Sequence, residues 1–384
     1  MTHSHTTGPL AGLRVVELAG MGPGPFASML LADLGAEVLR VDRPSGTGGT
    51  AIPPELDALR RGRSSVVLDL RRPEGARAVL DLVARADVLI EGNRPGVTER
   101  LGLGPEDCWA RNPRLVYARM TGWGQDGPLA ASAGHDITYL ALTGALHAMG
   151  RKGEGPAVPL NLVGDFGGGS LYLVVGVLAA VFEATGSGKG QVVDAAIVDG
   201  ATSLTTVLHA MMAAGMWRDE RGVNMLDTGS PWYDVYETSD GRHMAVGAIE
   251  PKFYAELMTL LGLDPDEGRR RDAAAWPALR EEIAAVLRTR TRDEWAKVFD
   301  GTDACVAPVL SLTEARHHPQ LAERGTFVEI GGVPQPAPAP RFGRTPAPVP
   351  QAPVAPGADT RRALTEWGVS EVDALIESGV AVQA

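Results

Sequence analysis

Short apolar segments rich in β-branched residues alternate with helical segments along the first third of the chain. The run LRVVELA, the turn GMGPGP and the periodic stretch FASMLLADLGA predict a buried strand, a tight turn and a helix. The pattern recurs, so five strands are expected, at residues 13–19, 37–42, 64–70, 87–92 and 115–121. Strand–helix alternation of this kind is typical of an α/β fold, with a parallel sheet that helices cover on both faces.

The pattern changes after Asp136. Two apolar helices are predicted at residues 137–149 and 170–184, separated by a glycine-rich turn at residues 164–169. The segment from residue 188 is expected to form a strand that runs into a long helix ending near Met216. A smaller α+β region follows, with strands at YDVYET and HMAVGAI and helices at FYAELMTLLG, WPALREEIAAVLRT and TRDEWAKVF.

The C-terminal part begins with nine prolines among residues 334–356. Proline disfavours helices and central strands, so this segment is expected to run extended over the surface as a strap. The last segment, ADTRRALTEWGVSEVDALIESG, has capping residues and helical periodicity, which predicts terminal helices.

Composition and charge disfavour several classes of protein function. The 384 residues include 47 acidic and 36 basic side chains and carry a net charge of −11, which disfavours nucleic acid and anionic membranes as partners. The longest apolar run, Leu171–Phe182, is shorter than the roughly 20 residues that span a bilayer. Cys108 and Cys305 are far apart and the histidines lack metal-ligand spacing, so neither a disulfide scaffold nor a metal site is expected. The start has no signal-peptide pattern, so a cytoplasmic location is expected.

Arginines follow the ends of three predicted strands. Arg43, Arg71 and Arg94 come directly after the second, third and fourth strands. Ligands of open α/β sheets bind outside the carboxyl ends of the strands. Guanidinium groups bind phosphates bidentately and stack on purines. The three arginines therefore indicate a nucleotide or polyphosphate ligand, although any one of them alone fits a solvated surface.

The first strand–helix turn superficially matches a dinucleotide-binding fingerprint. Gly20, Gly22 and Gly24 follow a strand, and Asp42 ends the next strand. Pro25, however, stands where the third glycine belongs. This spacing favours a simple tight turn and disfavours a nicotinamide-dependent dehydrogenase.

Four titratable residues, at three places along the chain, are candidates for the chemistry. His135 and Asp136 immediately precede an apolar helix, where free N–H groups suit a developing oxyanion and a histidine can act as a general base. Asp165 precedes three glycines, and burial beside apolar helices would raise its pKa. Glu250 precedes Pro251 at a predicted helix start. The structural alternatives are helix capping for Asp136 and Asp165, a surface turn for His135, and the favourable charge of a Glu near a helix N-terminus for Glu250.

These residues lie in longer motifs. The chain resembles the family III CoA-transferases in the segments GPLAGLRVVELAGMGPGPFASMLLADLGAEVLRVDRP, ADVLIEGNRPGVTERLGLG, ARMTGWGQDGP, AGHDITY, NLVGDFGGGS and GKGQVVDAAIVDG. The resemblance implies an interlocked homodimer of two-domain chains. Its large Rossmann-like domain would comprise residues 1–200 and be completed by 330–384. A linker helix at 201–222, a small α+β domain at 223–310 and a return linker at 311–329 would complete the chain.

The resemblance also assigns roles. It implies an active site between the large domain of one chain and the small domain of its partner. His135 and Asp165 would be the acid/base pair, Glu250 would hold His135, and the backbone N–H of Asp136 would face the thioester oxygen. The residues implied to bind CoA and substrate are Arg43, Leu68, Asp69, Leu70, Arg71, Gly92, Asn93, Arg94, Arg100, Gly134, Ile137 and Tyr139.

The implied reaction interconverts (R)- and (S)-2-methylacyl-CoA by 1,1-proton transfer through an enolate, with no metal and no cofactor besides the CoA of the substrate. Two alternatives stay open. A CoA-transferase would use Asp165 as a nucleophile, and would not need His135 or Glu250. A non-catalytic acyl-CoA-binding protein would keep the arginines and need neither His135 nor Asp165.

Overall fold

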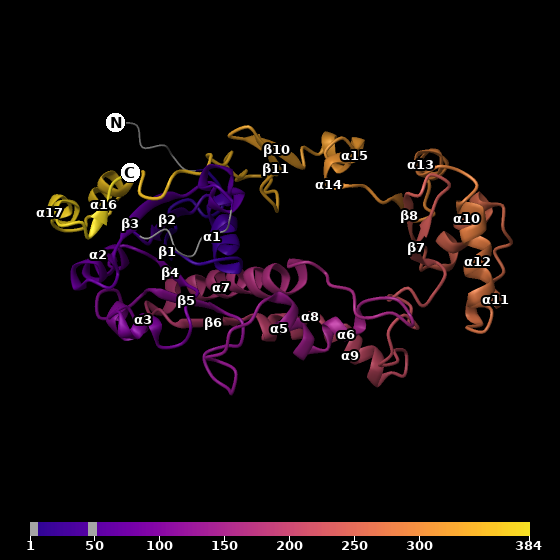
Figure 1. Ribbon diagram of the computed structural model, residues 1–384, viewed down its shortest axis with the longest axis horizontal. Helices are drawn as coiled ribbons and strands as arrows, with labels where there is room; N and C mark the ends of the chain where they lie inside the picture. The colour runs from indigo at the N-terminus through magenta and orange to yellow at the C-terminus, as the bar shows by residue number, and fades with distance from the viewer. Residues whose placement is uncertain (1–6, 45–51) are drawn as a thin grey trace. The chain divides into compact units, whose positions relative to one another are not determined.

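A seven-stranded sheet organises the first part of the chain (Figure 1). The computed structural model describes residues 7–44 and 52–384, so the start of the chain, on which the signal-peptide expectation rests, lies outside the described residues. The strands are β1 (Arg14–Leu18), β2 (Glu37–Asp42), β3 (Ser64–Leu68), β4 (Val88–Glu91), β5 (Val116–Thr121), β6 (Val192–Ala196) and β12 (Ala381–Val382). Their order is β12-β3-β2-β1-β4-β5-β6, parallel except for β12. The predicted α/β class is confirmed.

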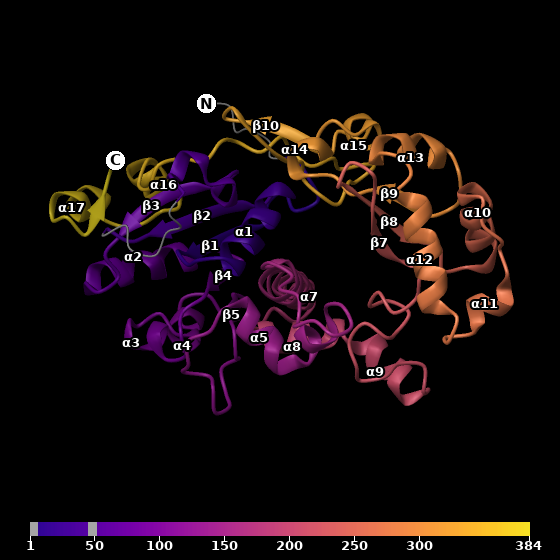
Figure 2. The ribbon, with the colours of Figure 1, turned by 45° about the vertical axis from the view of Figure 1, so that its right-hand side comes forward.

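Helices cover both faces of this sheet, because neighbouring residues of a strand point to opposite faces. Val15 packs on one face with α1 (Pro23–Asp33) and α7 (Leu171–Ser187), and Figure 2 looks along α7. Val16 packs on the other face with α2 (Pro73–Val83), α16 (Thr360–Glu366) and α17 (Val372–Glu377). The shorter helical elements are η1 (Pro54–Leu56), η2 (Ala58–Arg60), α3 (Val97–Arg100) and α4 (Pro105–Trp109). Strand order reverses between β1 and β4, which places a crevice at their carboxyl ends.

The structure corrects three helix predictions. The helix predicted at residues 137–149 is two helices, α5 (Asp136–Thr143) and α6 (Ala145–Ala148), because Gly144 between them has a left-handed φ of 81°. The predicted glycine-rich turn is a π-helix, η3 (Leu162–Ser170). The predicted long helix after β6 is α8 (Ile197–Leu204) and α9 (Thr206–Ala213).

Glycine permits the π-helix to pack closely against α8. A Cβ on Gly168 would lie 2.5 Å from the backbone nitrogen of Ala201 in α8, and a Cβ on Gly200 would lie 1.8 Å from the carbonyl oxygen of Gly168. Only glycines allow the two backbones to approach this closely. The glycine run therefore seats η3 against α8 instead of forming a turn.

The run from Leu162 to Ser187 contains 26 residues and is long and apolar enough to cross a membrane. The apolar run Leu171–Phe182, identified from the sequence, therefore underestimates the length of this helical segment. Leu173 and Val177 are nonetheless fully buried in the sheet core. Length and composition alone are weak evidence for a membrane span, since the core helix of a globular unit passes the same test.

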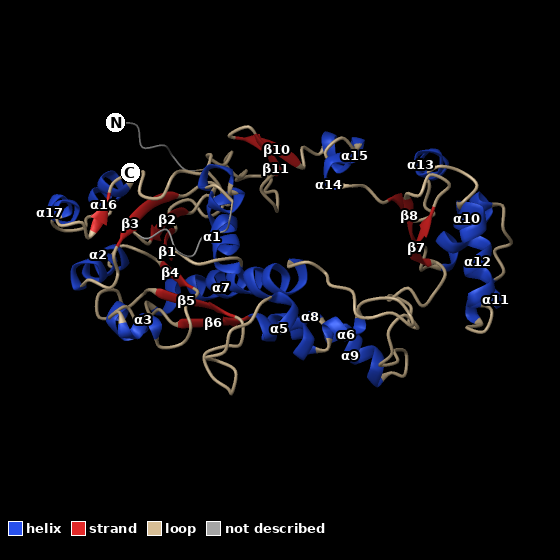
Figure 3. Cartoon of the chain, in the orientation of Figure 1, coloured by secondary structure: helices blue, strands red, loops and turns tan. Residues whose placement is uncertain are grey.

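The second unit has its own core, formed between the strands and helices that Figure 3 colours red and blue. Strands β7 (Tyr233–Glu237), β8 (His243–Gly247) and β9 (Val306–Pro308) form an antiparallel sheet. Helices α10 (Pro251–Leu261), α12 (Trp276–Leu287) and α13 (Arg292–Phe299) supply apolar side chains to that core. The remaining helices are α11 (Glu267–Arg271), α14 (Leu312–Ala315) and α15 (Pro319–Glu323). The predicted strands at YDVYET and HMAVGAI correspond to β7 and β8.

The unit boundaries differ in detail from the expected domains. The first unit comprises the described residues up to Thr143, Leu160–Leu204 and Arg324–Ala384. Gly144–Pro159, expected in the large domain, belongs to the second unit because Arg151 pairs with the buried Asp234 at 2.7 Å. The expected linker helix is divided, with α8 in the first unit and α9 in the second.

The proline-rich segment begins as a hairpin. Strand β10 (Phe327–Ile330) pairs with β11 (Val333–Pro336), so the first prolines of the expected strap lie in an edge strand. Arg61 anchors this hairpin, because its guanidinium donates to Gln335 Oε1 and to the carbonyl oxygen of Pro336, each at 2.8 Å.

Candidate active site

A cavity of about 350 Å³ lies at the carboxyl ends of β1, β2 and β3, beside the point where the strand order reverses. We call it the cationic pocket. It is lined by Leu18, Ala19, Val41, Arg43, Pro44, Leu68, Asp69, Leu70, Arg71, Asn93, Val97 and Leu101. Six residues predicted to bind CoA are thus brought together here from three loops.

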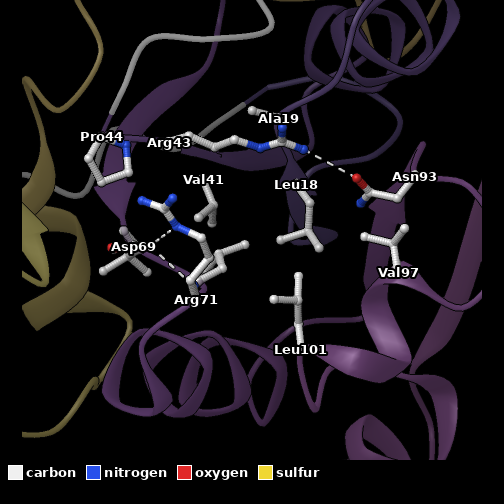
Figure 4. A pocket seen from close by; sticks show the side chains of 12 residues that line it. Leu18, Ala19, Val41, Arg43, Pro44, Asp69, Arg71, Asn93, Val97 and Leu101 are labelled. Carbon is white, nitrogen blue, oxygen red and sulfur yellow. Dashed lines mark hydrogen bonds and ion pairs between the residues drawn. The ribbon is translucent and has the colours of Figure 1, made fainter.

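Polar side chains frame an apolar floor in the cationic pocket (Figure 4). Arg43 extends across one side and donates from Nη2 to Asn93 Oδ1 at 3.2 Å. Arg71 lies on the other side, 81% exposed, and pairs with Asp69 at 3.2 Å. Leu18, Val41 and other aliphatic side chains lie between them. An apolar floor flanked by exposed guanidinium groups suits a nucleotide, whose base is apolar on its faces and whose phosphates are anionic.

A second cavity, of about 410 Å³, lies beside the first and shares Asn93 with it. We call it the acid–base pocket. It contains His135, Asp165 and Arg94. Its other lining residues are Met21, Gly22, Pro23, Gly92, Asn93, Pro95, Met120, Thr121, Gly122, Trp123, Ala130, Ser132, Ala133, Gly134, Tyr139 and Ile197. The first strand–helix turn, interpreted from the sequence as a simple tight turn, therefore also forms part of this wall.

The carboxylate of Asp136 connects the two candidate acid/base residues. Asp136 is buried and is the first residue of α5, directly after the exposed His135. Its Oδ2 accepts the backbone N–H of Asp165 at 2.6 Å. The side chain therefore holds η3 next to the start of α5. As the first helical residue, Asp136 also has a backbone N–H with no intrahelical acceptor.

Burial, and to a smaller extent the neighbouring carboxylate of Asp136, raise the pKa of Asp165 to about 6. His135 acts in the opposite direction. The second carboxylate oxygen of Asp136 is buried without a hydrogen-bond partner among the described residues, so the charge of Asp136 is poorly compensated. A carboxyl group with this pKa can take up or release a proton near neutral pH.

Tyr139 is packed so tightly that glycine is required beside it. A Cβ on Gly134 would lie 2.4 Å from the Tyr139 ring, and a Cβ on Gly122 would lie 2.1 Å from it. The ring also makes an edge contact with Trp123, with centroids 4.8 Å apart. Burial and the nearby Asp165 raise the pKa of Tyr139. Gly134 thus contributes by making space for the ring, which fixes the wall behind the acid/base pair.

Three predicted residues lie elsewhere. Ile137 is 41% exposed on α5 and Arg100 is exposed at the end of α3, and neither lines the two cavities. Glu250 is the N-cap residue of α10 in the second unit, whereas His135 belongs to the first. Its role towards His135 therefore stays a prediction.

Sequence reasoning missed a charged pair beneath the pockets. Glu91 ends β4 and is only 2% exposed, and its neighbour in the sheet register, Arg119 of β5, is 7% exposed. A charged residue inside an apolar strand such as VLIE or VYARMT is the signal that could have identified them. Among residues 7–44 and 52–384, no group of three His, Cys, Asp or Glu side chains could hold a metal ion.

Comparisons with known proteins agree on one family. The sequence matches the model described as CoA-transferase family III over residues 10–360. It is 48% identical over 370 residues to the alpha-methylacyl-CoA racemase of Mus musculus, and each chain is 95% covered. It is 47% identical over 366 residues to the alpha-methylacyl-CoA racemase of Homo sapiens, with 94% of each chain covered. The crystal structure of a CaiB/BaiF family protein from Brucella suis matches with a TM-score of 0.80 and 28% identity, covering 94% of this chain and 100% of that one.

Proposed function

Because this chain belongs to CoA-transferase family III, we propose that it acts on CoA thioesters, as a racemase that interconverts (R)- and (S)-2-methylacyl-CoA. One observation carries the proposal: His135 and Asp165 line the same cavity, which adjoins a pocket suited to a nucleotide. The identity of 48% to a racemase over 95% of the chain supports the same reaction.

In the proposed mechanism, one of the two groups removes the α-proton of the thioester. The electron pair of the broken C–H bond forms an enolate, and the second group delivers a proton to the opposite face. His135 and Asp165 fill these roles in turn, one starting as base and the other as acid. The pKa of Asp165, raised to about 6, lets it exchange a proton near neutral pH. The thioester carbonyl already acidifies the α-proton, so we propose that neither a metal nor a redox cofactor takes part.

The negative charge of the enolate resides on the thioester oxygen. We assign its stabilisation to the backbone N–H of Asp136, at the start of α5, where helix N–H groups lack intrahelical acceptors. The side chain of Asp136 supports this placement by accepting the N–H of Asp165. We further propose that Glu250 orients His135.

The cationic pocket supplies binding. Arg43 and Arg71 would meet the phosphates of CoA, and the aliphatic floor between them would meet its adenine. Arg94 lies in the acid–base pocket, past Asn93, where the chain from CoA to the acyl group would pass. The acyl group would then reach His135 and Asp165.

A second copy of the chain completes the proposed enzyme as an interlocked homodimer. On α7, Leu171, Val175 and Phe182 are 49%, 65% and 81% exposed. Apolar side chains of this size are costly to leave in water, and a second copy of the chain would cover them. Sedimentation equilibrium tests this proposal: a dimer is expected, and a monomer at micromolar concentration would contradict it.

The reaction is tested with one enantiomer of a 2-methylacyl-CoA in D₂O, without any free carboxylic acid. Incorporation of α-deuterium together with loss of optical purity is the expected result. No exchange, followed by CoA transfer once a free acid is added, would instead support a transferase with Asp165 as the nucleophile. Binding of CoA without either reaction would support a non-catalytic binding protein.

A further inference from the structure

Glu91 and Arg119 are buried charged residues on strands β4 and β5, whose other buried residues are uncharged. They lie on neighbouring strands and are paired in register, with Arg119 Nε 3.9 Å from Glu91 Oε1. Removing two charges from water is expensive, and an apolar pair of similar size often serves stability as well or better. A purely structural requirement is therefore a poor explanation for charges at these positions.

Glu91 holds the loop that follows β4. Its Oε2 accepts the backbone N–H of Asn93 at 2.6 Å. Asn93 lines both the cationic pocket and the acid–base pocket, and its side chain accepts a hydrogen bond from Arg43. The position of Glu91 therefore determines where the two pockets meet.

Arg119 forms hydrogen bonds to two further segments beside the pockets. Its Nη2 donates to Glu99 Oε1 at 2.6 Å, which holds α3 beside the loop after β4. Its Nη1 donates to Gln125, in the loop between β5 and α5. Gln125 in turn donates its backbone N–H to Asp194 of β6 at 3.0 Å. One guanidinium thus joins two segments that flank the pockets.

We propose that Glu91 and Arg119 are positioning residues. They hold the Gly92–Arg94 loop beside α3 and beside the loop that contains Gln125, so that bound CoA is aligned with the acid–base pocket. This inference rests on the proposed function only in taking CoA as the ligand. Neither residue lines the cationic pocket or the acid–base pocket, so both act through others, Glu91 through Asn93 and Arg119 through Glu99 and Gln125.

The electrostatics of Glu91 are consistent with this role. Burial raises the pKa of Glu91 and Glu99 adds to the rise, whereas the N–H of Asn93 and the charge of Arg119 oppose it, which leaves the pKa at about 7. The contacts that hold the loop therefore favour the charged carboxylate, which burial disfavours. A neutral side chain at this position would accept the Asn93 N–H more weakly.

Two conservative variants test the proposal, Glu91→Gln and Arg119→Lys. Glu91→Gln keeps the shape of the side chain and removes its charge. Arg119→Lys keeps the charge and removes the fork that reaches Glu99 and Gln125 together. Each is expected to weaken CoA binding, measured by titration calorimetry, about tenfold. Turnover at saturating 2-methylacyl-CoA should stay within about twofold of the wild type, so that KM and not kcat changes. The matched control, Arg111→Lys on the exposed turn after α4, should bind CoA as the wild type does.

A double variant separates positioning from stability. Replacing the pair by Glu91→Met and Arg119→Met removes both buried charges and should preserve or raise the melting temperature. CoA affinity should nevertheless stay about tenfold below that of the wild type. Affinity equal to the wild type in the double variant, or in both conservative variants, would overturn the proposal.

The outcomes also separate this inference from the proposed function. A wild-type protein that binds CoA but does not racemise would refute the racemase while leaving the calorimetric test of Glu91 and Arg119 valid. A wild-type protein that racemises, with variants that bind CoA normally, would refute the positioning role alone. A wild-type protein that bound no CoA would overturn both.

Discussion

The cationic pocket and the acid–base pocket lie at the same edge of the same sheet and share Asn93, yet their charges are arranged differently. In the cationic pocket, the charged groups of Arg43 and Arg71 are exposed, and Arg71 pairs with Asp69. In the acid–base pocket, Asp165 is half-buried next to the buried Asp136, and its pKa is raised to about 6.

This difference separates binding from chemistry. Exposed guanidinium groups keep their charge at any physiological pH and attract phosphates, but they transfer no protons. A carboxyl group in a desolvated site, close to another carboxylate, is held near the point where it changes protonation state. Variants in the first pocket should therefore change the affinity for CoA, and variants in the second should change turnover.

The largest expected effect is that of Asp165→Asn, which keeps the size of the side chain and removes the acid/base group. Racemisation at saturating substrate should fall by about 10²–10⁴-fold, while the Kd for CoA from calorimetry should stay within about twofold. If the variant lost CoA affinity to the same extent as turnover, the two pockets would not be functionally separate.

The opposite pattern, weaker CoA binding with unchanged turnover, is expected for Arg43→Ala in the cationic pocket. The substitution removes a charge-assisted contact to phosphate and the hydrogen bond to Asn93, so CoA should bind about tenfold more weakly. Turnover at saturating acyl-CoA should be unchanged. Steady-state kinetics with separate kcat and KM values provide the check, and an unchanged KM would contradict the assigned role.

A change in pH dependence is expected for Asp136→Asn. Asp165 is ionised above its pKa of about 6 and loses its base form as the pH falls through that value, so the direction of reaction that uses it as base should slow there. Removing the negative charge of Asp136 removes one cause of the raised pKa. The acid limb of the pH–rate profile should therefore move to lower pH, whereas the exposed Asp126→Asn should leave it in place.

The smallest effect is expected for Arg71→Ala. Its side chain is 81% exposed and already pairs with Asp69, and exposed ion pairs contribute little. CoA affinity should change by no more than about threefold in calorimetry. A loss as large as that of Arg43→Ala would mean that Arg71, despite its exposure, carries an equal share of phosphate binding.

Much of this arrangement could be predicted from the sequence. The strands β1 to β5 are short apolar runs bounded by turns, and the arginines that follow them lie where parallel strands end. Local pattern is sufficient for such features because each is decided within a few residues. Four pocket residues could also be predicted from local sequence, because they come directly after strands or precede helices: Arg43, Asn93, His135 and Asp165.

Other features depend on packing between distant segments. The glycines of η3 form a π-helix because α8 approaches closely at Gly200, about thirty residues later in the chain. The pairing of Glu91 with Arg119 depends on the register of β4 against β5. The sequence around Asp136 is compatible with a helix cap, whereas its carboxylate in fact accepts the N–H of Asp165, 29 residues later in the chain. The charges of Glu91 and Arg119 stand out within their apolar strands, but no local pattern shows which distant group each of these residues contacts.

The most direct test of the central claim is α-deuterium incorporation in D₂O, measured for each enantiomer of a 2-methylacyl-CoA separately, in the wild type and in Asp165→Asn. The wild type should exchange and racemise both enantiomers. The variant should bind CoA normally and lose racemisation, but still exchange the α-proton of the one enantiomer that His135 deprotonates. If Asp165→Asn racemised both enantiomers at the wild-type rate, the assignment of the acid–base pocket as the site of proton transfer by His135 and Asp165 would be wrong.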